Sequence, residues 1–391
     1  MNQSKGYSFF NYWDEKILFL TIICTLILSI ILFTLFQTET IPKSNNLLPT
    51  KCDYNRERFF ITDKSLESGL SVLTNTNLSI VVQFPSPSNV SKSLWIKSNH
   101  EIWSLDISTG NIYIMQSINM KIVNTISLAT FGCLGANEFA YDPQAYVNPI
   151  TGKLSGQVWA TCSASNMSVV IDTSSYSIIG NIPIPANIAG TKTPAFVSVG
   201  PGFAFIVYYP NVWYLYSTNA PFNIVTFGYT PGNSAFAMTQ VWRGNDNNNN
   251  AYLYIATTAP SIVQMVWNSH LSIKTITITP YPIQEITTSL NEEYLYVLFQ
   301  INNLLFIYKT DGMSLVPGTF SAILSTPNSL AVGRKNTQLL ITDSNSIYVL
   351  LIELNPSTGK PISGSETYIF LGTGATDSIR FVQQCPCHFC L

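Results

Sequence analysis

The densest group of metal-ligating and redox-active side chains lies at the C-terminal end of the sequence. Residues 385–391 are CPCHFCL, with three thiols and the imidazole of His388 within six residues. Thiolates and imidazoles are preferred ligands of Zn²⁺, but ligands this close together rarely surround a tetrahedral ion without a second cluster, and the sequence contains none. In an oxidising compartment the same thiols form disulfides. Disulfide bonding, metal binding and free or lipid-linked thiols are therefore three alternatives for this tail.

Other side chains with catalytic potential are few and scattered. The three histidines, His100, His270 and His388, are far apart in the sequence. The motifs HExxH, GxSxG, GxGxxG and the P-loop are all absent, so the common enzyme signatures are missing. We therefore predict that the protein is not an enzyme. We assign no catalytic, cofactor-binding or metal-binding residue and expect no cofactor.

Three aspartates, Asp106, Asp172 and Asp311, each follow an apolar stretch with the pattern of a strand. We expect all three at the same position of a repeated unit, at the end of its third strand, where their carboxylates could act as ligands of Ca²⁺. The alternative is that each carboxylate accepts hydrogen bonds from backbone N–H groups of its own turn. We favour this local role for the turns LDISTG, IDTSSY and KTDG.

The composition indicates a folded protein with little charge. Hydrophobic residues make up 46% of the 391 residues and charged residues 10%, whereas about a quarter of the residues are charged in typical soluble domains. The 19 basic and 21 acidic side chains give a net charge of -2. A nucleic-acid-binding face needs an excess of Lys and Arg to replace phosphate counterions. We therefore expect no nucleic-acid partner.

An uncharged apolar segment near the N-terminus has the length of a membrane span. Residues 17–36, ILFLTIICTLILSIILFTLF, would form a helix about 30 Å long, which matches the thickness of a bilayer core. A cleaved signal peptide is the alternative, but its apolar region would be shorter and would end in a small-x-small site. The sequence thus predicts a tail at 1–16, a membrane anchor at 17–36 and a stalk at 37–52.

Cysteines and glycosylation motifs favour a C-terminal domain outside the cytosol. Six of the seven cysteines follow the anchor, as do the Asn-x-Ser motifs that begin at Asn77, Asn89 and Asn166. Basic residues are nearly balanced on the two flanks of the anchor, so the positive-inside rule does not decide the orientation. We expect a single-pass protein whose large domain lies at the cell surface, in an endomembrane lumen or on a virion membrane.

Strand-like apolar patterns recur between residues 53 and 384. Seven of them begin at positions 59, 94, 158, 203, 252, 294 and 339, and most spacings suit one four-stranded blade. The 64-residue gap after the second start predicts an insertion at 131–155. A further short strand precedes the later starts, at 195–199, 235–240, 285–290 and 329–332, and another follows the last start, at 378–382.

The clearest copy of this pattern, at residues 157–183, contains VWATC, MSVVID and SIIGNIP. It resembles the YVTN-type repeat of the quinoprotein and NHL-like β-propeller superfamily. The resemblance implies an all-β, seven-bladed propeller over residues 53–384, whose inner strands line a central channel. The strand at 378–382 would complete the first blade and close the ring, which leaves 385–391 as a Cys-rich tail.

Ring closure would bring the two ends of the propeller together. Cys52 precedes the first predicted strand, and Cys385 and Cys387 follow the last one. Adjacent strands lie about 4.8 Å apart, which a disulfide can span, so we expect Cys52 to pair with Cys385 or Cys387. Cys133 and Cys162 flank the predicted insertion and form the second candidate pair.

Two functions suit this architecture. The first, which we expect, is a membrane-anchored recognition module that presents propeller loops to an unknown protein or glycan partner, as a surface or virion-membrane protein. The alternative is a propeller enzyme of the lactonase, lyase or dehydrogenase type with its site at the central channel. The predicted inner strands offer only one acid, Glu285, beside Ser198, Thr239, Gln240, Thr287 and Thr288.

Overall fold

Strands account for most of the structure, as the abundance of Val, Ile, Tyr, Phe and Thr favours. The computed structural model describes residues 58–63, 71–74, 80–83, 90–96, 99–116, 121–147, 154–188, 193–200, 202–231, 235–241, 251–267, 272–289, 291–299, 303–318, 320–321, 324–333, 337–371 and 376–382. All of these residues belong to one unit of the chain, Cys52–Leu391.

The strands within these ranges form seven four-stranded antiparallel sheets, numbered here as blades from the inner strand outward. Blade 1 contains β28 (Thr376–Val382), β1 (Arg58–Asp63), β2 (Ser71–Thr74) and β3 (Ile80–Gln83). Blade 2 contains β4 (Val90–Ile96), β5 (Glu101–Asp106), β6 (Asn111–Gln116) and β7 (Ile122–Ser127). The 3-10 helix η3 (Leu128–Phe131) connects it to blade 3, which contains β8 (Ala136–Val147), β9 (Leu154–Cys162), β10 (Met167–Asp172) and β11 (Ile178–Pro183).

The second half of the chain continues in the same order. Blade 4 contains β12 (Thr193–Gly200), β13 (Phe203–Tyr209), β14 (Val212–Ser217) and β15 (Ile224–Tyr229). Blade 5 contains β16 (Ala235–Val241), β17 (Ala251–Thr257), β18 (Ser261–Trp267) and β19 (Ser272–Ile278). Blade 6 contains β20 (Ile283–Thr288), β21 (Tyr294–Phe299), β22 (Leu304–Lys309) and β23 (Phe320–Ser321). Blade 7 contains β24 (Pro327–Gly333), β25 (Gln338–Asp343), β26 (Tyr348–Glu353) and β27 (Thr367–Phe370).

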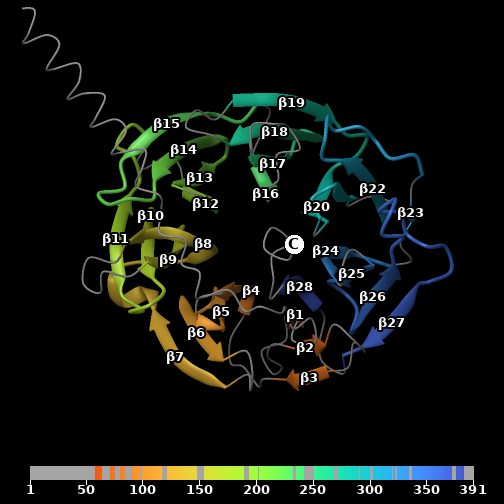
Figure 1. The fold of residues 1–391 in the computed structure, drawn as a ribbon, viewed down its shortest axis with the longest axis horizontal. Coiled ribbons are helices and arrows are strands. Elements are labelled where there is room, and N and C mark those ends of the chain that lie inside the picture. The colour runs from red at the N-terminus through yellow and green to blue at the C-terminus, as the bar shows by residue number, and fades with distance from the viewer. Residues whose placement is uncertain are drawn as a thin grey trace, which may run out of the picture. The chain divides into compact units, whose positions relative to one another are not determined.

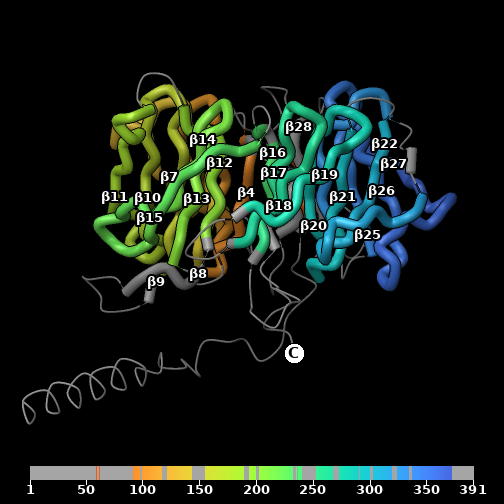
Figure 2. The backbone as a smooth tube through the Cα atoms, turned by 90° about the horizontal axis from the view of Figure 1, so that it is seen from above, coloured from red at the N-terminus to blue at the C-terminus, as the bar shows by residue number. Residues whose placement is uncertain are grey.

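The blades are arranged in a ring around a central channel, so the expected all-β propeller is confirmed (Figure 1). One strand of each blade faces the centre of the ring, and the strands of a blade run across its thickness (Figure 2). β28 pairs antiparallel with β1, with Phe59 opposite Phe381 and Ile61 opposite Ile379. The last strand of the chain therefore belongs to the first blade, which removes two open sheet edges.

The hydrophobic core lies between neighbouring blades. Each of its clusters of buried side chains joins two consecutive blades, from blades 2 and 3 around the ring to blades 7 and 1. Trp103 and Trp159, both fully buried, are among the largest side chains in these layers. Because both faces of each sheet are covered in this way, the second strands are continuously apolar, as in FAFIVYY and YLYVLF.

Side-chain hydrogen bonds reinforce the same boundaries between blades. Gln157 in blade 3 donates to the carbonyl of Thr218 in blade 4, over 3.0 Å. Tyr254 in blade 5 donates to the carbonyl of Thr310, which follows β22 of blade 6, over 3.0 Å. These bonds satisfy buried polar groups that would otherwise cost stability in the core.

Two details of the predicted repeat are wrong. The pattern that starts at Leu94 belongs to β4, the inner strand of blade 2, whereas the other six starts fall on second strands. Inner and second strands carry similar apolar patterns, so the sequence does not distinguish them. The supposed insertion at 131–155 consequently contains β8, the inner strand of blade 3.

The predicted tail at 1–16, anchor at 17–36 and stalk at 37–52 lie outside the described residues. Within the ranges given above, no helix is long and apolar enough to cross a membrane. The Cys-rich tail at 385–391 also lies outside these ranges, as do Cys52 and Asn77.

Candidate functional site

Six inner strands carry a β-bulge at the same position. In β4, for example, Val90 pairs with Asp106 and Lys92 pairs with Leu105, so one residue is left without an opposite partner. The same shift recurs in β8, β12, β16, β20 and β24. Bulges redirect neighbouring side chains. The residues directly after the bulges all line one cavity, and they are Lys92, Glu138, Phe196, Ala237, Glu285 and Ser329.

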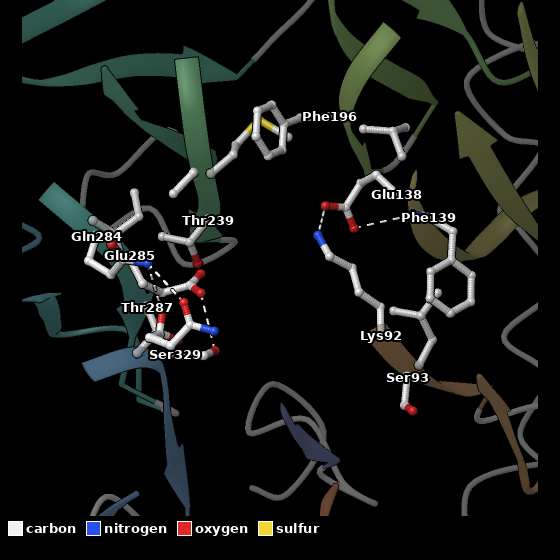
Figure 3. A pocket seen from close by; sticks show the side chains of 16 residues that line it. Lys92, Ser93, Glu138, Phe139, Phe196, Thr239, Gln284, Glu285, Thr287 and Ser329 are labelled. Atoms are coloured by element: carbon white, nitrogen blue, oxygen red, sulfur yellow. Dashed lines mark hydrogen bonds and ion pairs between the residues drawn. The ribbon is translucent and has the colours of Figure 1, made fainter. Parts of the chain in front are cut away.

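This cavity occupies the channel between the inner strands and has a volume of about 420 Å³. An ion pair between Lys92 in blade 2 and Glu138 in blade 3 forms one side of it (Figure 3). The backbone N–H of Phe139 donates a second hydrogen bond to Glu138, over 3.2 Å. Both charged side chains are largely buried, with exposed fractions of 22% for Lys92 and 12% for Glu138. The Lys92 ammonium is thus already matched by a carboxylate.

A second carboxylate lies on the opposite side of the cavity. Glu285 in blade 6 accepts a 3.1 Å hydrogen bond from the hydroxyl of Ser329 in blade 7 (Figure 3). Beside it, the amide of Gln284 donates to the side-chain oxygen of Asn328 over 2.9 Å. These contacts between blades 6 and 7 hold the Glu285 carboxylate against the wall of the cavity. The one positive and two negative side chains described in the lining give a formal charge of -1.

The wall between the two carboxylates is apolar. Phe196 of blade 4 and Met238 of blade 5 both line the cavity, and both pack against the core cluster between these blades, which includes Phe205 and Leu253. Ala237 also lines the cavity, and Thr239 and Thr287 lie on the same side of it as Glu285 (Figure 3). The cavity therefore combines an anchored apolar surface with two separate polar groups, as ligand-binding pockets commonly do.

Part of this site was accessible from the sequence. Of the expected channel residues, Glu285, Thr239 and Thr287 line the cavity. Ser198 is buried, and Thr288 is not among the lining residues. The side chain of Gln240 lies outside the described part of the structure.

Lys92, Glu138 and Ser329 also line the cavity, and the sequence pattern did not identify them as site residues. Lys92 precedes the strand start predicted at position 94, and Glu138 falls in the insertion predicted at 131–155, because the pattern did not identify the inner strands of blades 2 and 3. The signal that could have located them is an Asn-Glu or Gln-Glu pair near the start of an inner strand, since Asn137-Glu138 and Gln284-Glu285 occupy the same bulge position.

The remaining predicted site residues lie away from the channel. Cys133 and Cys162 are joined in a disulfide with a Cα–Cα distance of 5.1 Å, and both are buried. Asn166 lies in the turn between β9 and β10 with a positive φ of 51°, and its glycosylation stays a prediction. Asn89 and the cysteines Cys385 and Cys387 lie outside the described residues.

The aspartates of the repeat act locally. Asp106 accepts hydrogen bonds from Ser108 and from Thr109, and Asp172 accepts them from Ser174 and Ser175 in the same way. Asp106 ends the second strand of its blade and Asp172 the third, so the two do not occupy equivalent positions. Among the described residues, no group of three or more His, Cys, Asp or Glu could hold a metal ion.

Comparisons with known proteins give structural but no sequence relatives. No protein-family model matches the chain, and a search of curated proteins gives no match. The periplasmic gluconolactonase PpgL of Pseudomonas aeruginosa is similar with a TM-score of 0.64 and 13% identity, over 83% of this chain and 99% of that chain. A protein from Lactobacillus plantarum gives the same four values. A putative 6-phosphogluconolactonase from Bacteroides fragilis has a TM-score of 0.59 and 11% identity, over 85% of this chain and 99% of that chain.

At these identities the likeness shows the fold, a β-propeller, and not the activity. It nevertheless overturns the expectation that the protein is not an enzyme. That expectation rested on missing catalytic motifs, yet propellers of this shape include a protein named as a gluconolactonase and one named as a putative 6-phosphogluconolactonase. The prediction that the protein is not an enzyme is therefore wrong. The absent motifs belong to other enzyme folds, so their absence does not exclude an active site in the channel of a propeller.

Proposed function

We propose that the channel cavity is the active site of a hydrolase that opens a small lactone. The observation that carries this proposal is the placement of Glu285, held by Ser329, across the cavity from the Lys92–Glu138 ion pair (Figure 3). A carboxylate and an ammonium on opposite sides of one substrate-sized cavity supply a base and an electrophilic group. The names of the similar propellers from P. aeruginosa and B. fragilis support lactones as the substrate class.

Glu285 is the better candidate for the general base. Glu138 is already engaged by the Lys92 ammonium and by the backbone N–H of Phe139, so removing a proton from water would compete with these contacts. Glu285 accepts a 3.1 Å hydrogen bond from the hydroxyl of Ser329, which fixes its carboxylate at the cavity wall. Ser329 thus orients the Glu285 carboxylate toward the cavity, and we assign Ser329 a positioning role.

In the proposed reaction, an oxygen of Glu285 removes a proton from a water molecule while the water oxygen forms a bond to the lactone carbonyl carbon. The charge that develops on the carbonyl oxygen is stabilised by the Lys92 ammonium. When the tetrahedral intermediate collapses, the ring C–O bond breaks, and the leaving oxygen takes the proton from Glu285. The product is the open hydroxy acid, and Glu285 is regenerated as a carboxylate.

The described lining residues do not fit a resident metal ion. Their two carboxylates lie on opposite sides of the cavity, and each is engaged by a side chain of the adjacent blade. No step of the proposed reaction therefore depends on a metal.

The experiment is lactone hydrolysis by the purified full chain, measured as acid release over a panel of γ- and δ-lactones. We expect Glu285→Gln to lower kcat/KM by about 100-fold or more, as loss of a general base does. Glu353→Gln is the matched control, because Glu353 is an exposed residue of β26 outside the cavity. Hydrolysis no faster than in buffer across the panel, or equal rates for the two variants, would overturn the proposal.

We further propose that residues 17–36 anchor the propeller in a membrane and that the propeller lies outside the cytosol. The Cys133–Cys162 disulfide supports this location, because disulfides are rare in the cytosol. Protease added to sealed cells should then digest the propeller and spare a tag placed before Met1. Protection of the propeller would contradict this orientation.

We also propose that the blades are YVTN-type repeats. The order of β9, β10 and β11 in blade 3, with MSVVID as the third strand, supports this assignment. A profile built from the seven blades that matched YVTN repeats no better than other propeller repeats would argue against it.

A further inference from the structure

The charges of the described lining residues disfavour an anionic ligand. Lys92 is the one cation among the described lining residues, and Glu138 is bound to it. A phosphate or carboxylate group would have to displace Glu138 from Lys92, and it would also face the second carboxylate, Glu285. Two like charges within a few ångströms repel strongly in a partly buried site.

The apolar wall favours a ligand with a hydrocarbon part. Phe196 of blade 4 and Ala237 and Met238 of blade 5 all line the cavity, and Phe196 and Met238 pack against the core cluster between these blades. A ligand whose whole surface is covered with hydroxyl groups would leave this wall without an apolar partner. A short acyl or alkyl group would bury against it, which is favourable by the hydrophobic effect.

From these two features together we infer that the cavity selects an uncharged lactone with an apolar substituent and excludes phosphorylated sugar lactones. The inference rests on the proposed function, since it names the substrate class of the same site. The substituent lies on Phe196 and Met238, and the lactone ring lies between Glu285 and Lys92. Glu138 acts as the selectivity residue because a phosphate would have to displace it from Lys92, whereas the carbonyl oxygen of a lactone can accept a hydrogen bond from the ammonium while the Lys92–Glu138 ion pair stays intact.

The test is equilibrium binding of three lactams, in which a ring N–H replaces the ring oxygen so that hydrolysis does not interfere. The probes are a hexanoylated amino-lactam, gluconolactam and 6-phosphogluconolactam, titrated calorimetrically into the full chain. We expect the acylated lactam to bind about tenfold or more tightly than gluconolactam, as burial of a short chain allows, and the phosphorylated lactam to bind most weakly. Tightest binding of the phosphorylated lactam, or no binding of any of the three, would overturn the inference.

Variants separate the two contributions. Phe196→Ala should weaken binding of the acylated lactam about tenfold and leave gluconolactam unchanged, whereas Phe370→Ala, at an exposed position of β27, should change neither. Met238→Gln tests the same wall if Phe196→Ala does not fold. Glu138→Gln should free Lys92 and raise the affinity for the phosphorylated lactam about tenfold, with Glu353→Gln as its control. Unchanged phosphate affinity in Glu138→Gln would overturn the charge argument.

Binding and turnover distinguish this inference from the proposed function. If the lactams bind in the expected order but no lactone is hydrolysed, the cavity has the stated selectivity and is not a hydrolase site. If lactones are hydrolysed but the order of binding is reversed, the hydrolase proposal stands and the selectivity inference fails.

Discussion

The hydroxyl of Tyr176 donates a 2.5 Å hydrogen bond to Oε1 of Glu101 on the neighbouring blade. The other oxygen of this carboxylate, Oε2, accepts a 3.0 Å bond from the indole N–H of Trp103. Glu101 is buried, so the boundary between blades 2 and 3 contains a charge whose two oxygens are both satisfied. Burial, together with the bond to Glu101, raises the pKa of Tyr176 to about 12.

Tyr176→Phe should therefore destabilise the propeller. At pH 7 we expect the free energy of unfolding to fall by about 1.5–3 kcal/mol, the range for a hydrogen bond to a charged group. Tyr229→Phe, at a residue that is 64% exposed, should have little effect in the same urea titration. Equal midpoints for the two variants would show that the bond between the blades does not contribute to stability.

The same bond predicts a dependence on alkaline pH. Because the pKa of Tyr176 in the folded state lies above its ordinary value near 10, its contribution is complete below pH 10 and is lost as the pH rises through about 12. The wild-type protein should lose stability over this interval more steeply than Tyr176→Phe. Parallel curves of unfolding free energy from pH 9 to 12 would contradict the assignment.

Most of the strand order could be predicted from the sequence. The starts at 203, 252, 294 and 339 fall within one residue of β13, β17, β21 and β25, because each second strand is buried on both faces and carries an unbroken apolar run. The long-range pairing of β28 with β1 could also be predicted. The pattern that starts at position 59 has no short strand before it, whereas the last pattern is followed by an additional strand at 378–382.

The site was harder to predict, for a physical reason. A bulge adds one residue to a strand and turns the following side chain toward the channel, yet the sequence still has the composition of a strand. Lys92 and Glu138 meet only because two bulges on separate blades lie side by side, and no local pattern records that proximity. The disulfide between Cys133 and Cys162 could be predicted, because the two cysteines lie at the two ends of the segment that forms the β8–β9 hairpin.

Asp343→Asn should weaken blade 7 and change its response to acid. Burial would raise the pKa of Asp343, but hydrogen bonds from Thr326, Asn345 and Ser325 outweigh it and hold the pKa below its ordinary value. The stabilisation is therefore present above pH 4 and is lost as the pH falls through the lowered pKa. We expect a loss of about 1–3 kcal/mol at pH 7 and a flatter stability curve below pH 4.

The control for this prediction is Asp311→Asn, because Asp311 is exposed and its carboxylate lies in a surface turn. Chemical unfolding of both variants at pH 7, 4 and 3 provides the comparison. A constant difference between wild type and Asp343→Asn at all three pH values would argue that the ionised form of Asp343 contributes nothing.

Gly359→Ala should disturb the contact between blades 6 and 7. Gly359 has a φ of +66°, and a Cβ at this position would lie 2.7 Å from ring atoms of Tyr294. Its carbonyl also accepts a 3.0 Å hydrogen bond from the hydroxyl of Tyr296. Gly364 has a φ of +78° with no atom near its Cβ position, so Gly364→Ala introduces the backbone strain alone. We expect Gly359→Ala to cost about 1–3 kcal/mol more than Gly364→Ala in urea unfolding, and similar costs would disprove the steric argument.

Removal of β28 tests the closure of the ring. In the structure, β28 covers the inner edge of β1, whose Phe59 and Ile61 are buried in the core shared with blade 7. A chain that ends at residue 375 would expose the inner edge of β1 and the core between blades 7 and 1. We expect this chain to unfold at a lower temperature or to aggregate. A chain that ends at residue 382 keeps β28 and is the matched control. Thermal unfolding followed by circular dichroism, with light scattering for aggregation, provides the measurement. Equal midpoints for the two truncated chains would mean that the propeller does not depend on closure by its last strand.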